Sequence, residues 1–163
     1  MPPKGESWFI APKIDVPAGF SGAVILAAFG RKPPAERDRL VYALVNVFDV
    51  GLPGLDNRDA VVRAATEALK KGTARQRVLD LNVAPASSPA PNCARYRRTA
   101  EMDANSILVT TGVMCAHPHW SRYVLDIHYG ERYKQGLQPL PLEADVETFL
   151  GGVIFTPQRP IVE

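Results

Sequence analysis

Apolar and polar residues alternate most clearly between residues 122 and 129. One set of alternate positions is entirely aromatic or aliphatic: Tyr123, Leu125, Ile127 and Tyr129. A period of two is typical of a half-buried strand, and residues 106–115 upstream are also rich in strand-forming side chains. Between the two runs, Pro118 cannot donate a hydrogen bond to a strand ladder. The pattern therefore predicts an antiparallel hairpin whose connection carries His117 and His119.

The first half of the chain predicts two strands followed by two helices. Residues 8–10 and 23–29 are apolar runs of strand length, separated by Pro12, Pro17 and Gly19. Between residues 31 and 48, apolar side chains recur at steps of three and four from residue 40 onward, which predicts a helix with one face on a core. A second helix is predicted over residues 57–71, with Asp56 or Asn57 as its N-cap and an alanine-rich apolar face.

The second half predicts further strands, two long loops and a short helix. Residues 76–83 have the composition of a strand, and residues 84–92 form a loop rich in proline and serine. Residues 93–102 are expected to be a polar edge strand, and we interpret its arginine cluster as edge protection rather than as an anion site. That cluster consists of Arg95, Arg97 and Arg98. After the hairpin, we expect a loop over 130–141, a helix over 142–150 and a last strand over 153–156.

These elements predict a single α+β domain over residues 1–163, with a mostly antiparallel sheet of five or six strands and two or three helices packed on it. The length of 163 residues is sufficient for a substantial core. The net charge of +2 is small, and its basic residues are scattered rather than clustered in a polybasic block, which argues against nucleic-acid binding. No apolar run has the length of a membrane span, and the first residues do not have the pattern of a signal or transit peptide.

The histidines suggest a metal site as one interpretation of the hairpin. Cys115, His117 and His119 occupy alternate positions, and His128 returns on the partner strand, so these side chains could converge on zinc or copper. The interpretation that we favour places His117 and His119 on a solvated turn, because this spacing is not a common zinc motif. Ser121 completes no catalytic motif with these residues, since no Gly-x-Ser-x-Gly sequence surrounds any serine.

Two cysteines, Cys93 and Cys115, are present in the chain. An even count is compatible with one disulfide in an oxidising compartment, and two buried thiols in a reducing compartment are the alternative. The sequence pattern leaves both possibilities open.

The last third of the chain resembles a known family. Three features resemble proteobacterial cell-envelope lipoproteins: Cys115-x-His117-Pro118, a strand ending at residues 127–132, and a helix ending in the segment 149–155. The same layout is similar to the C-terminal domain of immunity lipoproteins that neutralise phospholipase effectors of type VI secretion. Gly130 and Gly152 stand where the family pattern has serine.

The resemblance implies a periplasm-facing lipoprotein domain in which Cys93 and Cys115 are bridged and the lipidated cysteine lies upstream of Met1. It predicts a non-enzymatic envelope protein that binds and inhibits a toxin, a lipase or another hydrolase, without a cofactor. We expect recognition on the loops at 84–92 and 130–141, because such loops commonly carry binding residues. The candidate anchors are Trp120, Arg132, Tyr133 and Lys134.

Two other functions remain open at this point. One is a metal-binding protein or metal-dependent enzyme that uses Cys115, His117, His119 and His128. The other is a structural envelope lipoprotein without a toxin partner. The expected location is the periplasm or cell envelope, with the cytoplasm as the alternative.

Overall fold

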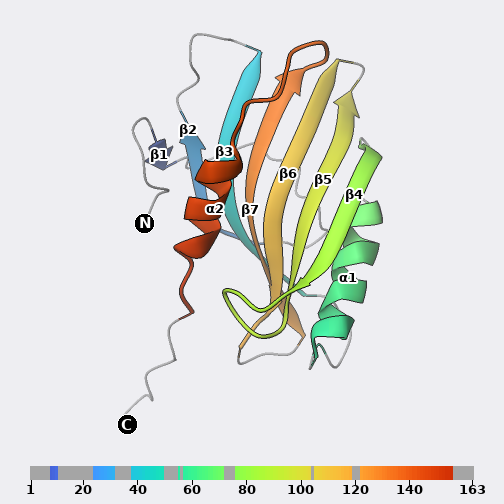
Figure 1. Cartoon of the computed structure of the whole chain (residues 1–163), viewed down its shortest axis with the longest axis vertical. Helices are drawn as coiled ribbons and strands as arrows, with labels where there is room; N and C mark the ends of the chain where they lie inside the picture. The colour runs from blue at the N-terminus through green and yellow to red at the C-terminus, as the bar shows by residue number, and fades with distance from the viewer. Residues whose placement is uncertain are drawn as a thin grey trace.

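A computed structural model describes residues 8–10, 24–31, 38–49, 55, 57–71, 76–103, 105–118 and 122–155. In these residues seven strands form one sheet and two helices pack on it, as Figure 1 shows. The strands are β1 (Trp8–Ile10), β2 (Val24–Arg31), β3 (Arg39–Asp49), β4 (Arg77–Ala86), β5 (Cys93–Asp103), β6 (Ser106–Ala116) and β7 (Tyr123–Lys134). The helices are α1 (Arg58–Lys71) and α2 (Glu143–Gly151).

The sheet has the strand order β1-β2-β3-β7-β6-β5-β4, and every neighbouring pair is antiparallel. The consecutive strands β3 and β4 are not neighbours, so the segment containing α1 carries the chain across the sheet. The predicted α+β class with a mostly antiparallel sheet is confirmed. The described residues contain seven strands, however, rather than five or six.

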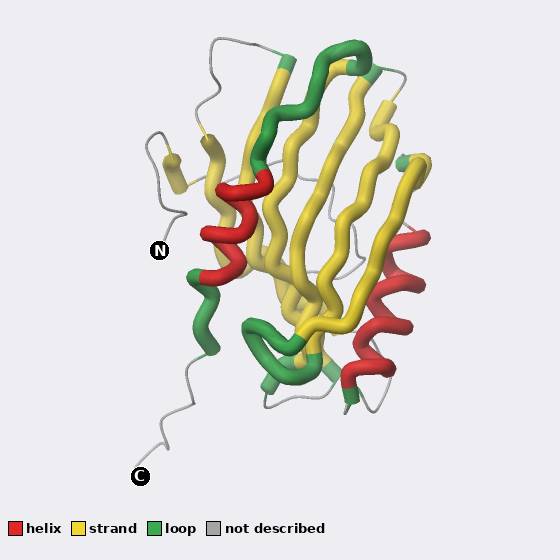
Figure 2. The backbone as a smooth tube through the Cα atoms, in the orientation of Figure 1, coloured by secondary structure: helices red, strands yellow, loops and turns green. Residues whose placement is uncertain are grey.

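The two helices lie on opposite faces of the sheet, as the tube in Figure 2 also shows. α1 packs on β4, β5 and β6, whereas α2 packs on β6 and β7. We call the side that carries Met114 and Val124 the α1 face, and the side that carries Cys115 and Ile127 the α2 face. Because α2 does not cover β4 and β5, Asn82 and other polar side chains of these strands remain exposed on the α2 face.

The helix predicted over residues 57–71 is present as α1, and its N-terminus is capped as expected. The Asn57 Oδ1 atom accepts a hydrogen bond of 2.9 Å from the backbone N–H of Ala60, which satisfies one of the free donors of the first turn. The buried side of the helix consists of Val61, Ala65 and Leu69. This apolar stripe packs on the core of the α1 face.

The helix predicted between residues 31 and 48 is wrong over residues 39–48, and residues 32–37 lie outside the described residues. Residues 39–49 form strand β3, which pairs with β2 on one side and β7 on the other. A strand that is buried on both faces has an almost continuous apolar sequence, which also satisfies the three- and four-residue spacing of a helix. Val41 and Ala43 lie in the core of the α2 face, while Leu44 and Phe48 are buried on the α1 face.

Three further predictions need correction. The polar strand beginning at Cys93 is β5, an interior strand between β4 and β6, so its arginines do not protect an edge. The predicted loop at 130–141 begins only after Lys134, because β7 continues the alternating pattern to that residue. Residues 153–155 form no strand, and the side chains of Val153 and Phe155 pack directly against the core of the α2 face. Thr156 lies outside the described residues.

The Cys93–Cys115 disulfide is present, which confirms the pairing that the family resemblance implies. The two residues lie directly opposite each other on β5 and β6, with their Cα atoms 4.1 Å apart. Both are fully buried within the core of the α2 face. The surrounding core consists of Phe29, Val41, Ala43, Val113, Ile127, Tyr129, Val146 and Leu150.

Candidate functional site

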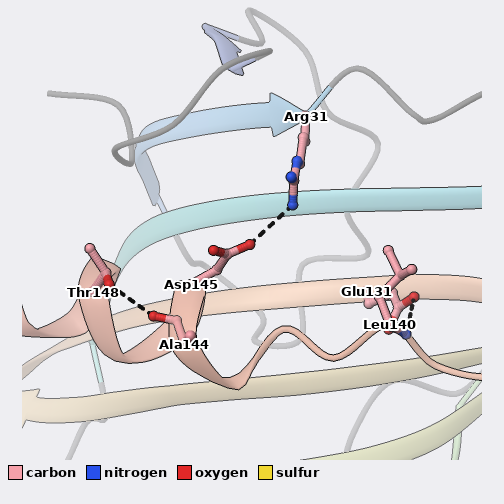
Figure 3. Close-up of polar contacts among 6 residues, drawn as sticks. All are labelled: Arg31, Glu131, Leu140, Ala144, Asp145 and Thr148. Carbon is pink, nitrogen blue, oxygen red and sulfur yellow. Dashed lines mark hydrogen bonds and ion pairs between the residues drawn. The ribbon is translucent and has the colours of Figure 1, made fainter.

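The segment between β7 and α2, residues 135–142, crosses the α2 face and is attached to it by a buried ion pair. We call this segment the connector. Arg39 of β3 and Glu131 of β7 form the pair, and their side chains are only 5% and 4% exposed. The Glu131 carboxylate also accepts hydrogen bonds from the backbone N–H of Leu140, at 3.2 Å to each oxygen, as Figure 3 shows. The Arg39 guanidinium donates to the backbone oxygen of Gln138 at 2.9 Å.

These contacts explain why two charges are buried at this position. Removing both ions from water is costly, and the cost is offset only when most of their hydrogen-bonding groups find partners. The ion pair itself and the backbone groups of the connector supply these partners. The Arg39–Glu131 pair therefore ties the connector to the sheet shortly before α2 begins.

α2 is held on the sheet by an apolar side and by two arginines that reach it from different strands. Val146 and Leu150 are buried in the core of the α2 face. Arg31 at the end of β2 contacts Asp145, with Nη1 3.1 Å from Oδ2, as Figure 3 shows. Arg95 of β5 binds Glu147 through both guanidinium nitrogens, one of them at 3.1 Å. The helix is thus attached from both sides.

A groove with a volume of about 340 Å³ lies between α2, the connector and strands β4 to β7. Its base contains the side chains of Asn82, Arg97 and Thr111, which form one cross-strand row on β4, β5 and β6. Tyr129 of β7 continues that row beneath α2. The opposite side of the groove is formed by Pro139, Leu140, Leu142, Glu143, Val146 and Glu147. The groove thus combines a polar base with a side on which apolar residues and two glutamates, Glu143 and Glu147, are mixed.

The tyrosines on this face remain neutral at physiological pH. Burial, reinforced by the nearby Asp145 carboxylate, raises the pKa of Tyr129 to about 12. Burial and the Glu131 carboxylate also raise the pKa of Tyr133, while the Arg39 and Arg97 guanidinium groups act in the opposite direction.

A second polar cluster is buried on the α1 face. The Asp126 carboxylate accepts a hydrogen bond of 2.8 Å from the Tyr96 hydroxyl and one of 3.4 Å from the Asn46 amide, and it lies 2.9 Å from His128 Nδ1. Asp126 is 1% exposed. Burial raises the pKa of Tyr96 well above its ordinary value, and the Asp126 charge raises it further, so the Tyr96 hydroxyl remains a donor. The members of this cluster bind one another and are not open to a substrate.

The structure separates the residues of the proposed metal site. Cys115 is bonded to Cys93 and lies on the α2 face, whereas His128 points to the α1 face beside Asp126. His117 is at the end of β6, where its backbone N–H donates to Tyr123 O at 2.8 Å. At about 3.4 Å per residue, the stretch of β7 from Tyr123 to His128 separates the two histidines by roughly 17 Å.

The structure describes only part of the proposed metal site. His119 lies outside the described residues. Within the residues that are described, no three His, Cys, Asp or Glu side chains come together in a way that could hold a metal ion. Ser121, the serine considered with Asp126 and His128, is also outside the described residues.

The predicted partner-binding residues fall on both faces of the sheet rather than on one loop. Arg132, Tyr133 and Lys134 belong to β7, so their side chains alternate between the faces. Arg132 and Lys134 are exposed, and Lys134 lies 3.7 Å from Asp38. Tyr133 is buried on the α2 face, with its ring 5.7 Å from the Arg39 guanidinium carbon. Trp120 lies outside the described residues.

Sequence reasoning did not identify Arg97 as a groove residue, nor the Arg39–Glu131 pair. The signal for Glu131 is present in the alternation, which continues beyond Tyr129 and places Glu131 and Tyr133 on the same face as Tyr129. No local signal marks the pairing of Arg39 with Glu131, because the two residues are 92 positions apart in the chain.

Neither described helix is long and apolar enough to cross a membrane. No protein-family model matches the chain, and no curated protein or solved structure matches it either.

Proposed function

We propose that this protein is a non-enzymatic binding protein of the bacterial cell envelope, of the immunity type, that binds and inhibits a secreted hydrolase such as a type VI lipase effector. The observation that carries the proposal is the Cys93–Cys115 disulfide. It joins the Cys-x-His-Pro element of the resembling family to the strand that begins at Cys93. A buried disulfide is also compatible with an oxidising compartment, as the envelope location requires.

The two faces of the sheet support a binding role in different ways. On the α1 face, the Asp126 and His128 side chains are buried and lie within hydrogen-bond distance of each other. This acid–base pair therefore faces the interior of the protein and is not accessible to a ligand. On the α2 face, the groove has a base of paired strands and a side formed by a helix that two arginines hold in place. Recognition surfaces are commonly built on such rigid supports.

Inhibition of a purified hydrolase tests the proposal directly. Each secreted lipase and each other secreted hydrolase of the source organism is purified and titrated with this protein in its oxidised form. We expect one enzyme to lose its activity at a stoichiometric ratio, with no loss in the presence of an equal amount of an unrelated disulfide-containing protein. Full activity of every such enzyme in the presence of an excess of this protein would overturn the proposal.

Metal analysis of the purified protein and the phenotype of a deletion strain distinguish the two alternative functions. Stoichiometric zinc or copper in untagged protein, lost on joint substitution of His117→Ala and His119→Ala, would favour the metal-binding alternative. A deletion strain with a weakened envelope and unchanged resistance to the secreted hydrolases would favour a structural envelope role. If the protein is an inhibitor, as proposed, the deletion strain should have an intact envelope and should be sensitive to one hydrolase.

A further inference from the structure

The groove beside α2 contains an arginine, Arg97, that forms no ion pair with the described residues. Arg97 is exposed in the base of the groove, between Asn82 and Thr111 on the neighbouring strands. Among the residues that the structure describes, no carboxylate lies within ion-pair distance of the Arg97 guanidinium. The other arginines of this face that approach α2 and the connector are engaged, Arg31 by Asp145, Arg39 by Glu131 and Arg95 by Glu147.

We propose that the groove binds an aspartate or glutamate side chain of the protein partner, and that the Arg97 guanidinium forms the ion pair with its carboxylate. This inference rests on the proposed function, since it assumes a protein partner. An arginine binds a carboxylate through two parallel N–H···O bonds, which gives both charge neutralisation and a defined orientation. The Thr111 hydroxyl and the Asn82 amide, one strand away on either side, are further donors for the same carboxylate.

The charges around the groove favour a ligand with a single negative charge. Glu131 and Glu147 are each neutralised by an arginine, so they do not oppose an incoming carboxylate at full strength. Glu143 is exposed on the side of the groove, and no ion pair of the described residues involves it. A groove lined by one arginine and one glutamate without ion pairs in the described residues suits a ligand with one negative charge better than a doubly charged phosphate.

The shape and the apolar side of the groove favour a side chain on a polypeptide. Leu140, Leu142 and Val146 form the apolar part, which can pack against the aliphatic stem of the acidic residue or against an apolar neighbour. The groove volume of about 340 Å³ is at the small end of the range for ligand sites, so it accommodates a few side chains rather than a folded segment. The exposed surfaces of β4 and β5 leave room for the backbone of the partner.

A pair of capped peptides tests the site without the natural partner. The probes are acetyl-Leu-Glu-Leu-amide and the matched acetyl-Leu-Gln-Leu-amide, and the readout is the arginine Nε–H and backbone amide spectrum of the isotope-labelled protein. We expect the Glu peptide to shift the signals of Arg97 and Thr111 and the Gln peptide to leave them unchanged. Equal shifts with both peptides, or shifts with neither, would overturn the inference.

Four variants make this test specific. Arg97→Ala should weaken Glu-peptide binding about tenfold, and Arg97→Lys should retain only part of it because the second hydrogen bond is lost. Glu143→Gln should strengthen binding by about twofold, since a repelling charge is removed. Arg63→Ala is the matched control: Arg63 is also exposed and has no ion pair in the described residues, but it lies on α1, on the other face. Unchanged binding by the Arg97→Ala variant would overturn the inference.

The same variants distinguish a failure of this inference from a failure of the proposed function. With an inhibited hydrolase in hand, Arg97→Ala should raise the inhibition constant about tenfold, and Arg63→Ala should not change it. If both variants inhibit as well as the wild type, the Arg97 site is wrong and the immunity role stands. If the wild type inhibits no hydrolase while the Glu peptide still binds at Arg97, the immunity role is wrong. In every case, an unchanged urea midpoint verifies that Arg97→Ala is folded.

Discussion

The two faces of the sheet bury polar groups for different purposes. On the α1 face, Asp126 binds Tyr96, Asn46 and His128, all of which project from strands, so the network is closed within the sheet. On the α2 face, the ion pairs attach α2 and the connector to the strands of the sheet. Arg31 and Arg95 reach α2, and the Arg39–Glu131 pair holds the connector.

This difference indicates where the stability of the protein lies and where its surface can adapt. A buried network that loses one member leaves the other members without hydrogen-bond partners, which is strongly destabilising. Exposed ion pairs contribute little to global stability, although they position the segment that they attach. We therefore expect substitutions in the Asp126 network to affect folding, and substitutions at the exposed Arg31–Asp145 and Arg95–Glu147 pairs to affect the local position of the helix.

The largest effect is expected for Asp126→Ala. The substitution leaves the Tyr96 hydroxyl and the Asn46 amide without their acceptor in the interior, and it creates a small cavity. We expect the free energy of unfolding to fall by about 4 kcal/mol in urea denaturation. Asp80→Ala, at an exposed position of β4, is the control and should change it by less than about 0.5 kcal/mol. Equal effects of the two substitutions would show that the Asp126 network on the α1 face does not stabilise the protein.

Removal of the disulfide tests how much the core of the α2 face depends on the covalent bridge. The double substitution Cys93→Ala and Cys115→Ala releases a cross-link between residues 22 positions apart. The chain-entropy model predicts a loss of about 3 kcal/mol for a loop of this size. Urea denaturation of the oxidised wild type and of the double variant provides the measurement. A difference smaller than that of any single surface variant would show that the core of the α2 face does not depend on the bridge.

Gly130 tests how tightly the α1 face is packed at a position where the resembling family has serine. A side chain at residue 130 would overlap the buried ring of Tyr42, which also contacts the ring of His128 edge-on at 5.8 Å between centroids. We expect Gly130→Ser to lower the free energy of unfolding by about 2 kcal/mol through overpacking. Thermal or urea denaturation measures the change.

Two controls accompany the Gly130 variant. Gly151→Ser at the end of α2 meets no atom within 4 Å of the new Cβ, so its effect should be small. In a Tyr42→Leu background the serine should cost much less than in the wild type, because the overlapping part of the ring is absent. The same cost in both backgrounds would show that Tyr42 is not the cause.

The elements that could be predicted from the sequence are those with a clear period. The alternation of β7 and the capped, amphipathic pattern of α1 identify both elements correctly. β3 could not be recognised as a strand, because an apolar run that is buried on both faces has no period to distinguish it from a helix. The polar residues after Tyr129 are also typical of a loop, so the predicted end of β7 is too early. In the structure the strand continues to Lys134, and the buried Glu131 is neutralised by Arg39 of β3.

The site was less predictable than the fold, because its residues depend on the strand order. Arg95, Arg97 and Arg98 form one cluster in the sequence, yet the structure gives each a different environment. Arg95 binds Glu147 of α2, Arg97 lies in the groove, and Arg98 points to the other face and donates to Leu69 O at the end of α1 at 3.0 Å. Local composition cannot distinguish these three environments, since it does not show which strands lie on either side of β5.

The smallest global effect, and the sharpest local one, is expected at the Arg95–Glu147 pair. Hydrogen bonding to Arg95 lowers the pKa of Glu147 below its ordinary value of 4.5. Because the pKa is lowered in the folded state, this contribution is present above about pH 4.5 and disappears as the pH falls through the lower, folded-state pKa. Glu147→Gln should therefore change the free energy of unfolding by less than about 1 kcal/mol at neutral pH.

The local consequence of this pair is measurable by amide hydrogen exchange in α2. At neutral pH, the Glu147→Gln variant should exchange faster than the wild type at the backbone of α2, with little change at the buried amides of β6. When the pH is lowered below 4.5, intrinsic exchange rates being taken into account, the wild type should lose protection in α2 until it approaches the variant, because protonation removes the charge that Arg95 binds. If the difference between the two proteins does not change with pH, the ion pair does not hold α2, and the apolar contacts of Val146 and Leu150 alone position the helix beside the groove.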